Sequence, residues 1–426
     1  MRQRLTITLT LLTVAALASV ATFTFTPGQP PSASGPARPA VYNEPAAAPK
    51  AKPPLHDLSK MSAPTRRIYL SARSGAEWLL RADNSANGRF LPGWNPALGQ
   101  PLESDSYLQQ CGATYALAKA ARYFGDERYL MKARQAILSL LVDTTTDPND
   151  SNCRYTSLPT IVVNPVAAAG MLLMAIHELQ SPADELLKSG EELCQFIRKQ
   201  QQPDGSFRLG EAGASLDAES ARTYPGMAIY GLVLSQRNRP AAWKREAALK
   251  AIQYYHQKWQ ADPSLSGGAW LTLACCECYI QGPDKKLAGY AFEISDWVCE
   301  QQYGQNASNP KWLGGSKARA NGKPALVQPR IDAALNLEAI ASACLVTRHL
   351  PDAQRYNKYR EALGMGSEFL IGLQFGEANT LHFSPGYRTA VIGGFHPSHD
   401  DGNLRLDYNH HAVCALVQSI TSAAMQ

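Results

Sequence analysis

The sequence lacks an excess of charge of one sign. It has 41 Lys and Arg residues against 36 Asp and Glu residues, and five of the basic residues but only one acidic residue precede residue 57. From residue 57 onward the net formal charge is therefore only +1, and no predicted helix carries a cluster of Lys or Arg. Nucleic-acid binding needs a concentrated basic surface. The sequence therefore argues against nucleic acid as a partner.

The sequence also lacks the even set of cysteines that a disulfide framework requires. It has nine, and eight of them lie in predicted helices among Ala and Leu, where a free thiol serves as a small apolar side chain. Cysteines 275, 276 and 278 cannot converge on one zinc ion, because successive helical positions point in different directions. The run at 398–403 could bind calcium through Asp400, Asp401 and Asn403, but we interpret it as a solvated turn. We expect free thiols, no metal site and no cofactor.

A long, largely apolar run lies at the N-terminus. Residues 1–26 begin with two arginines, continue as this run over residues 5–25, and offer a Ser-Val-Ala cleavage site at 19–21. This pattern is typical of an export signal peptide, and the run is also long enough to remain as a membrane anchor. The sequence leaves both alternatives open. In either case we expect the body of the protein to be extracytoplasmic, in the periplasm or at the cell surface, secreted or anchored.

The rest of the chain divides into a linker and one large body. Residues 27–56 are rich in Pro, Ala and Ser and hold few core-forming side chains, which is typical of a disordered, semi-extended linker. The whole chain is 45% hydrophobic and 18% charged, a composition that indicates a globular protein with a sizeable core. We therefore expect a single domain over residues 57–426.

This body is predicted to be a series of helical hairpins. Apolar residues recur with helical period, and loops containing Gly, Pro, Asp and Asn separate the segments, whereas no convincing run of alternating strand residues is present. In each pair a first helix rich in small residues precedes a more amphipathic second helix. The five predicted pairs are 107–123 with 129–142, 164–178 with 185–201, 224–235 with 243–260, 269–280 with 287–303, and 332–349 with 356–374.

Two predicted helices are left without a partner, residues 65–81 at the start of the body and residues 408–423 at its end. If these two pack together, the chain forms twelve helices in six hairpins and the ends of the array meet. An open array of hairpins needs capping at both ends, and closure removes those ends. The sequence therefore predicts an all-α fold, an (α/α)6 toroid with the small-residue helices inside.

A second repeat lies at the ends of the predicted outer helices. An aromatic residue, a Gln and a Gly-containing loop with another aromatic recur at 195–207 and 296–315, and related patterns occur at 77–90 and 368–383. The segment "QQQPDGSF" resembles the Gln-Asp-Gly-aromatic repeat of squalene-hopene-type cyclases, where it ties outer helices together. Over residues 64–424 the chain resembles the α/α-toroid superfamily, which includes six-hairpin glycosidases, related carbohydrate-active enzymes and terpenoid cyclases.

This resemblance implies a fold more firmly than a reaction. The cyclases that the chain resembles carry an Asp-rich DxDD motif, and the nearest run here, "SHDDGN" at 398–403, does not match it. A terpenoid-cyclase-like enzyme therefore remains an alternative that a pocket lined mainly by aromatic residues would favour. A non-catalytic glycan-binding or scaffold protein is the other alternative.

The loops before the inner helices should gather at one mouth of the barrel, where a pocket is the default ligand site. These loops supply carboxylates, arginines and aromatic rings, which suit a sugar or a uronic acid. The candidate catalytic residues are Asp332, Asp407, Glu219 and His410. The candidate substrate-binding residues are Glu103, Asp105, Arg222, Tyr224, Trp270, Arg330, Arg405 and Tyr408.

The sharpest local signals are "RID", which ends at Asp332, and "RLD", which ends at Asp407, at equivalent helix starts. Glycoside hydrolysis needs two carboxyl groups across the scissile bond, whereas lyase or epimerase chemistry needs a base such as His or Tyr and a cation for the sugar carboxylate. Each aspartate can instead be a simple N-cap worth about 1 kcal/mol. Because adjacent helical residues cannot both face a pocket, we favour His410 over His411.

The sequence thus predicts an exported carbohydrate-active protein that binds a glycan and cleaves or modifies it, by glycosidase, lyase or epimerase chemistry. Substrate, linkage and oligomeric state stay open at this point.

Overall fold

The computed structural model of this chain describes residues 55–210, 216–320 and 323–423. The segment predicted as signal peptide or membrane anchor and residues 27–54 of the predicted linker lie outside the described residues. The last two residues of that linker do not stand apart from the body, because the His56 ring stacks on Tyr123 with 4.5 Å between ring centroids. The described residues therefore cover most of the predicted toroid domain, and the packing against it includes His56, the last residue of the predicted linker.

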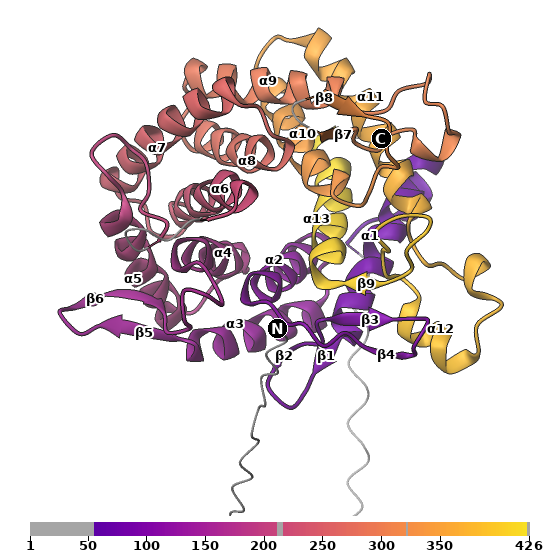
Figure 1. The fold of residues 1–426 in the computed structure, drawn as a ribbon, viewed down its shortest axis with the longest axis horizontal. Coiled ribbons are helices and arrows are strands. Elements are labelled where there is room, and N and C mark those ends of the chain that lie inside the picture. The colour runs from indigo at the N-terminus through magenta and orange to yellow at the C-terminus, as the bar shows by residue number, and fades with distance from the viewer. Residues whose placement is uncertain (1–54, 211–215, 321–322, 424–426) are drawn as a thin grey trace, which may run out of the picture. The chain divides into compact units, whose positions relative to one another are not determined.

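Twelve of the helices in the described residues form two concentric rings (Figure 1). The inner ring consists of α2 (Tyr107–Phe124), α4 (Pro165–Glu178), α6 (Ala218–Ser235), α8 (Leu265–Gln281), α10 (Ala333–Thr347) and α13 (Leu406–Ala423). The outer ring consists of α1 (Ala63–Arg81), α3 (Glu127–Val142), α5 (Asp184–Gln200), α7 (Ala242–Ala261), α9 (Lys285–Glu300) and α11 (Ala353–Gly372). The short α12 (Pro385–Val391) and the 3-10 turn η3 (Ala378–Thr380) lie between α11 and α13 in the sequence. Two more 3-10 turns, η1 (Leu58–Lys60) and η2 (Pro310–Trp312), precede α1 and follow α9, respectively.

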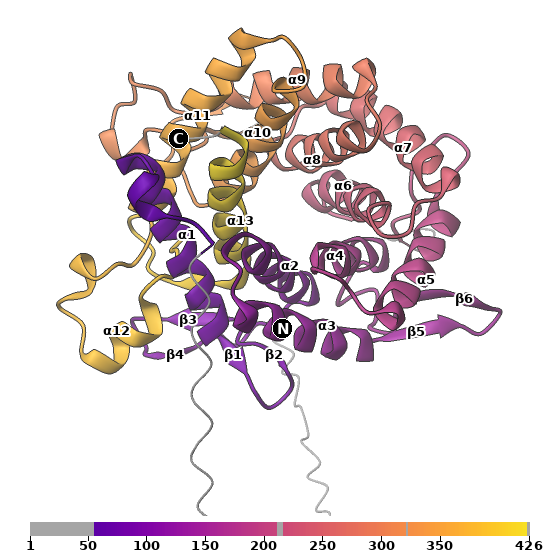
Figure 2. The same ribbon diagram turned by 180° about the vertical axis from the view of Figure 1, so that it is seen from behind.

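Helices from the two ends of the body close the ring. Each inner helix packs against the next one along the chain, and α13 packs against α2. Helix α1 packs along α13, so the first and last long helices form the sixth hairpin, as Figures 1 and 2 show from opposite sides. The prediction of an all-α (α/α)6 toroid of about twelve helices is confirmed.

Close approach of the inner helices explains their small residues. Helices α4 and α6 touch backbone to backbone: a Cβ atom on Gly231 would lie 2.3 Å from the carbonyl oxygen of Gly170, and a Cβ atom on Gly170 would lie 2.5 Å from the carbonyl oxygen of Met227. Larger side chains at these positions would overlap with the neighbouring backbone and push the helices apart. The small-residue pattern of the first helix in each pair therefore reflects crowding at the centre of the barrel.

A glutamine ties three of the outer-helix ends to the next outer helix. Gln302, just after α9, donates through Nε2 to the carbonyl oxygens of Gly314 at 2.9 Å and Ala362 at 3.1 Å, and Ala362 belongs to α11. In the same way Gln201 bonds to α7, and Gln374 bonds to α1. The repeated Gln and Gly loops of the sequence therefore link outer helices, as the resemblance implied.

Short antiparallel strands occupy several loops, and the sequence analysis did not predict them. They have two to seven residues, too few for an alternating pattern to stand out. The pairing of β3 with β9 matters for the site, because it joins the loop before α2 to the start of α13. The strands are β1 (Asp83–Asn84) with β2 (Arg89–Phe90), β5 (Thr144–Asp147) with β6 (Asp150–Thr156), β7 (Ala318–Ala320) with β8 (Lys323–Ala325), and β4 (Gln100–Pro101) with β3 (Gly93–Asn95) and β9 (Leu404–Arg405).

The cysteines have the state that the sequence predicted. All nine are free, and eight of them are buried, where they fill space as small apolar side chains. In the part of the chain that the structure describes, no group of three or more His, Cys, Asp or Glu side chains is placed to hold a metal ion. None of the helices in that part is both long and apolar enough to cross a membrane.

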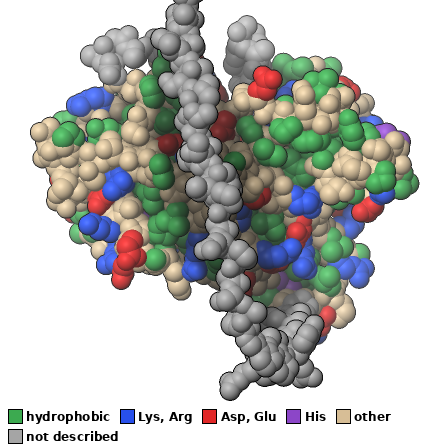
Figure 3. All heavy atoms as spheres, turned by 90° about the horizontal axis from the view of Figure 1, so that it is seen from below, with side chains coloured by type: hydrophobic (Ala, Val, Ile, Leu, Met, Phe, Trp, Pro, Cys, Tyr) green, Lys and Arg blue, Asp and Glu red, His purple; other side chains and the backbone are tan. Residues whose placement is uncertain are grey.

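Charges of both signs mix on the surface. On the face drawn in Figure 3, Lys and Arg side chains are interspersed with Asp and Glu. Many of them pair between neighbouring helices: Arg67 of α1 with Glu368 of α11 at 2.6 Å, and Arg355 of α11 with Asp296 of α9 at 2.9 Å. This distribution matches the small net charge of the body.

Candidate functional site

A cavity of about 790 Å³ opens at one end of the inner ring. Its wall comes from the first turns of α2, α6, α8, α10 and α13, from the loops before them, and from Met171 of α4. All the inner helices therefore contribute to it, at the mouth where the sequence analysis placed the ligand. The volume lies within the range of small-molecule sites, roughly 300–1,000 Å³.

Two thirds of the predicted site residues meet in this cavity. The other four do not line it. The lining residues are Asp332, Asp407, Glu219 and His410 from the catalytic set and Arg222, Trp270, Arg330 and Tyr408 from the substrate-binding set, and the remaining four are Glu103, Asp105, Tyr224 and Arg405.

Asp332 is the residue just before α10, and its side chain makes no N-cap hydrogen bond. The Asp332 side chain is exposed to the water of the cavity, while the surrounding cavity wall partly desolvates its carboxyl group. This burial, together with the negative charge of Asp407, raises the pKa of Asp332 above its usual value, although Arg330 acts in the opposite direction. A carboxyl group with a raised pKa is a candidate proton donor.

Asp407 lies in the first turn of α13 and has a different environment. The guanidinium of Arg405 donates through Nε to Oδ1 at 3.0 Å and through Nη2 to Oδ2 at 2.7 Å. A bidentate pair of this kind forms with an ionised carboxylate. Arg405 also lies over the Tyr408 ring, 4.9 Å from its centroid. Arg405 therefore fixes the orientation of Asp407, although it does not itself line the cavity.

The two adjacent histidines of α13 differ in surroundings. His410 is only 4% exposed and packs against α2, where a Cβ atom on Gly112 would lie 2.3 Å from its ring. Within the described residues neither of its ring nitrogens has a hydrogen-bond partner, and burial holds the pKa of His410 well below its usual value. His411 instead bonds through Nδ1 to Oε1 of Glu338 at 2.7 Å and lies edge-on to Trp270, 5.8 Å between centroids.

Both histidines border the cavity, but only His411 has a carboxylate that fixes the orientation of its ring. Such a pair leaves the second ring nitrogen free to accept or donate a proton. The structure therefore favours His411 over His410, the reverse of the choice made from the sequence.

Glu219 and Arg222 lie at the exposed rim, on the first turn of α6. Glu219 accepts a hydrogen bond from the hydroxyl of Ser266 at the start of α8, and Arg222 pairs with Asp262 in the loop before α8. These contacts tie α6 to the neighbouring segment. They place one carboxylate and one cation at the edge of the cavity, within reach of an extended ligand.

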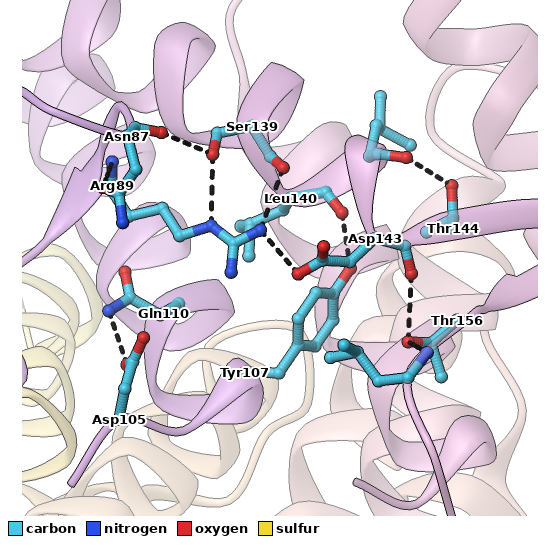
Figure 4. Close-up of polar contacts among 12 residues, drawn as sticks. Asn87, Arg89, Asp105, Tyr107, Gln110, Ser139, Leu140, Asp143, Thr144 and Thr156 are labelled. Carbon is cyan, nitrogen blue, oxygen red and sulfur yellow. Dashed lines mark hydrogen bonds and ion pairs between the residues drawn. The ribbon is translucent and has the colours of Figure 1, made fainter. Parts of the chain in front are cut away.

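Glu103 and Asp105 lie in the loop before α2, outside the cavity. Oδ1 of Asp105 accepts hydrogen bonds from Nε2 of Gln110 and from the backbone N–H of Ser106, each at 2.8 Å. Figure 4 shows this contact beside the ion pair of Arg89 with Asp143. Asp105 thus orders the start of α2.

Tyr224 falls inside α6, because the helix begins at Ala218 and not at residue 224. The side chain of Asp217 caps the helix through the backbone N–H of Ser220 at 2.9 Å. The prediction placed Tyr224 in a loop because Pro225 and Gly226 follow it, and both residues disfavour helix interiors. Tyr224 is not among the residues that line the cavity, although its neighbour Thr223 is.

Two further residues of α10 belong to the site and were missed. Asn336 lines the cavity, is 4% exposed and donates to Oγ of Ser316 at 3.0 Å, but its Oδ1 has no partner within the described residues. Glu338 holds His411. Asn336 lies four residues after Asp332, as His411 lies four after Asp407, so each pair shares a helix face. This spacing is the signal that could have identified Asn336.

No family model matches this sequence, and no curated protein matches it. Solved structures do match. A cellobiose 2-epimerase from Bacillus thermoamylovorans B4167 is 11% identical, with 83% of this chain and 98% of that chain covered and a TM-score of 0.60. An α-1,6-mannanase from Salegentibacter sp. HEL1_6 is 12% identical, with 84% and 100% covered and a TM-score of 0.59. The chain has the six-hairpin glycosidase-like toroid fold.

A third toroid, an unsaturated glucuronyl hydrolase from Streptococcus agalactiae, is 12% identical, with 84% of this chain and 92% of that chain covered and a TM-score of 0.57. At this identity the comparison establishes the toroid fold and leaves the reaction to the residues of the cavity.

Proposed function

We propose that this toroid binds a glycan in the cavity at the N-terminal ends of the inner helices and hydrolyses a glycosidic bond. Asp332 acts as the proton donor and Asp407 as the carboxylate base or nucleophile. The observation that carries the proposal is the difference between the two carboxyl groups: Asp332 faces the cavity water with a pKa that partial desolvation raises, and Asp407 is held by a bidentate arginine. Such divergence is how acid and base roles divide between two carboxyl groups.

The lining of the cavity supports a sugar as ligand. Tyr408 is only partly buried and offers ring surface for stacking, whereas Trp270 is 2% exposed and forms part of the cavity wall. The unpartnered Oδ1 of Asn336 can accept a hydrogen bond from a hydroxyl group. The charged groups that surround these rings fit a polar ligand better than the hydrocarbon substrate of a terpenoid cyclase. The structural neighbours named above act on sugars, which agrees with this proposal.

The substrate that we favour carries an acidic sugar. Arg330 lines the cavity next to Asp332, its side chain is exposed, and its guanidinium makes no hydrogen bond or ion pair with the described residues. An arginine in this position can hold a uronic-acid carboxylate through a bidentate pair. Lys317 also contributes to the lining.

A second reaction, lyase or epimerase chemistry, is favoured by the pair of His411 and Glu338. A histidine held by a buried carboxylate is suited to abstract a proton next to the sugar carboxylate, and Arg330 would stabilise the negative charge that develops. One of the structural neighbours is an epimerase. The two reactions differ in their products, so one assay separates them.

The test starts with the purified protein and a panel of neutral and uronic-acid oligosaccharides. We expect uronic-acid oligosaccharides to raise the melting temperature and to be cleaved with new reducing ends and no unsaturated product. Absorbance of an unsaturated sugar would indicate a lyase, and solvent deuterium in an otherwise intact sugar would indicate an epimerase.

Variants then separate catalysis from folding. We expect Asp332→Asn and Asp407→Asn to retain binding and to lose activity by at least a hundredfold, since each removes an acid or base group worth about 10²–10⁴ in rate. Asp184→Asn, on the exposed first turn of the outer helix α5, is the matched control and should be unchanged. Full activity in both cavity variants would refute the assignment.

We also propose that the protein works outside the cytoplasm, on the basis of the apolar run over residues 5–25 and the Pro-rich segment after it. Fusion of residues 1–60 to a reporter that is active only after export tests this point. A reporter that stays inactive would contradict it.

A further inference from the structure

A second cavity of about 520 Å³ lies at the opposite end of the barrel. Its wall comes from the last turns of the same inner helices whose first turns form the candidate active site, and Leu55 and His56 border its mouth. It therefore shares no residue with the candidate active site.

Three cationic and two acidic side chains line this cavity, a net formal charge of +1. Arg237 forms a bidentate pair with Glu277 at 2.6 and 2.7 Å and bonds to Glu178 at 3.0 Å. Arg122 also contacts Glu178, at 3.3 Å. These two arginines therefore neutralise the two carboxylates, which leaves the charge of Lys119 without an anionic partner.

Lys119 makes one hydrogen bond among the described residues, from Nζ to Oε1 of Gln418 at 2.8 Å. The ammonium group also lies over the Tyr115 ring, 4.8 Å from its centroid. An ammonium group has three donors, so these two contacts leave one donor for a ligand and give the charge no anionic partner among the described residues. Burial works against the charge, but the surrounding phenol, thiol and carboxylate side chains outweigh it and hold the pKa of Lys119 above its usual value. Lys119 lies five residues before the end of α2. The helix dipole acts mainly within the last turn, so it does little to stabilise the positive charge of Lys119.

An independent observation comes from Ser422, on the last turn of α13. Ser422 is 1% exposed and lines the cavity, yet its Oγ has no hydrogen-bond partner within the described residues. Ser422 follows Gln418 by four residues and Arg122 follows Lys119 by three, so each pair shares a helix face. A buried hydroxyl group without a partner is rare in native structures, and here it lines the same cavity as the ammonium group of Lys119.

Apolar side chains line the rest of this space, namely Leu273, Ile280, Leu345 and Val417. A cation and a hydroxyl group beside an apolar wall suit a ligand with one anionic group and a short apolar part. We propose that this cavity is a second binding site, for a small organic anion whose carboxylate or phosphate group pairs with Lys119 and bonds to Ser422. This site is independent of the function proposed for the first cavity.

The test measures, by calorimetry on the full chain, the binding of three probes in separate titrations. Hexanoate has both the anionic group and the apolar tail, hexanol has only the tail, and inorganic phosphate has only the anionic group. We expect hexanoate to bind and hexanol to bind at least tenfold more weakly, since a hydrogen bond to a buried charged group corresponds to about tenfold or more in affinity. Phosphate binding as well would identify the anionic group as the main determinant. Binding of neither anion would overturn the proposal.

Variants locate the site. We expect Lys119→Met to weaken hexanoate binding about tenfold or more, whereas Lys188→Met, on the exposed surface of α5, should leave it unchanged. Arg330→Gln and Asp332→Asn, in the first cavity, should also leave it unchanged. Binding that survives Lys119→Met, or that is lost in Arg330→Gln, would overturn the proposal.

A measurement on the unmodified chain covers the case in which Lys119→Met does not fold. Raising NaCl from 50 to 500 mM should weaken hexanoate binding and leave hexanol binding unchanged, because salt screens the pairing of charges. Equal behaviour of the two probes would exclude an ionic contact.

Discussion

Replacement of Gln302 by Leu should destabilise the barrel without touching either cavity. Gln302 is 8% exposed, and its two Nε2–H groups bond to one carbonyl in its own loop and one in α11. Leucine has a similar volume but leaves both carbonyl oxygens without a donor. Each lost bond of this kind costs about 1–3 kcal/mol, so we expect the loss of both to lower the free energy of unfolding by about 2–6 kcal/mol.

For a domain of this length, that loss corresponds to a fall in melting temperature of about 3–8 °C. The matched control is Gln260→Leu on the outer helix α7, where the amide of Gln260 makes only an exposed bond to Glu293; it should change stability by less than about 0.5 kcal/mol. Gln374→Leu should resemble Gln302→Leu, because Gln374 also donates to two backbone carbonyls. Equal melting temperatures for Gln302→Leu and Gln260→Leu would refute the role of the glutamine.

Three further predictions concern the cavity and the core. Because the pKa of Asp332 is raised in the folded state, Asp332→Asn should raise the melting temperature near pH 7, and the gain should disappear below the unfolded-state pKa of about 3.9; melting curves at pH 3.5 and pH 7 test this. Glu338→Gln removes the carboxylate that orients His411 and should reduce hydrolysis less than tenfold, because Asp332 and Asp407 are the proposed acid and base. A loss of a hundredfold or more in the same assay would show that His411 is the main acid or base. Gly231→Ala should lower the free energy of unfolding by about 1–3 kcal/mol through overlap with α4, whereas Gly289→Ala, where a Cβ atom would meet nothing within 4 Å, should be neutral or slightly stabilising in denaturant titrations.

Local sequence patterns predicted the ring of hairpins. The helical period and the small residues of each first helix depend on neighbours three and four positions away, which the sequence shows directly. Closure followed from the two helices that were left without a partner. The start of α6 was missed because Tyr224 precedes Pro225 and Gly226, although the N-cap at Asp217 sets the boundary.

The choice between the two histidines could not be made from local patterns. It depends on how α13 is rotated against its neighbours. In that rotation the His410 ring occupies the space that a Cβ atom at position 112 would need, and Gly112 leaves that space free. The partner of His411, Glu338, comes from a different helix and lies 73 residues away in sequence. Contacts of this kind are properties of the assembled barrel.

The parallel arrangement of the inner helices constrains how Asp332 works. The first turns of five of them meet at the candidate active site and their last turns at the other cavity, so partial positive charge from the helix ends gathers near Asp332 and favours its ionised form. The burial that raises its pKa acts against this field. A bound sugar displaces the remaining cavity water, which increases that burial and raises the pKa further. If Asp332 is the proton donor, kcat should therefore persist to higher pH than kcat/KM, since the first reports the complex and the second the free enzyme. Coincident alkaline limbs in the two profiles would assign the proton to another group.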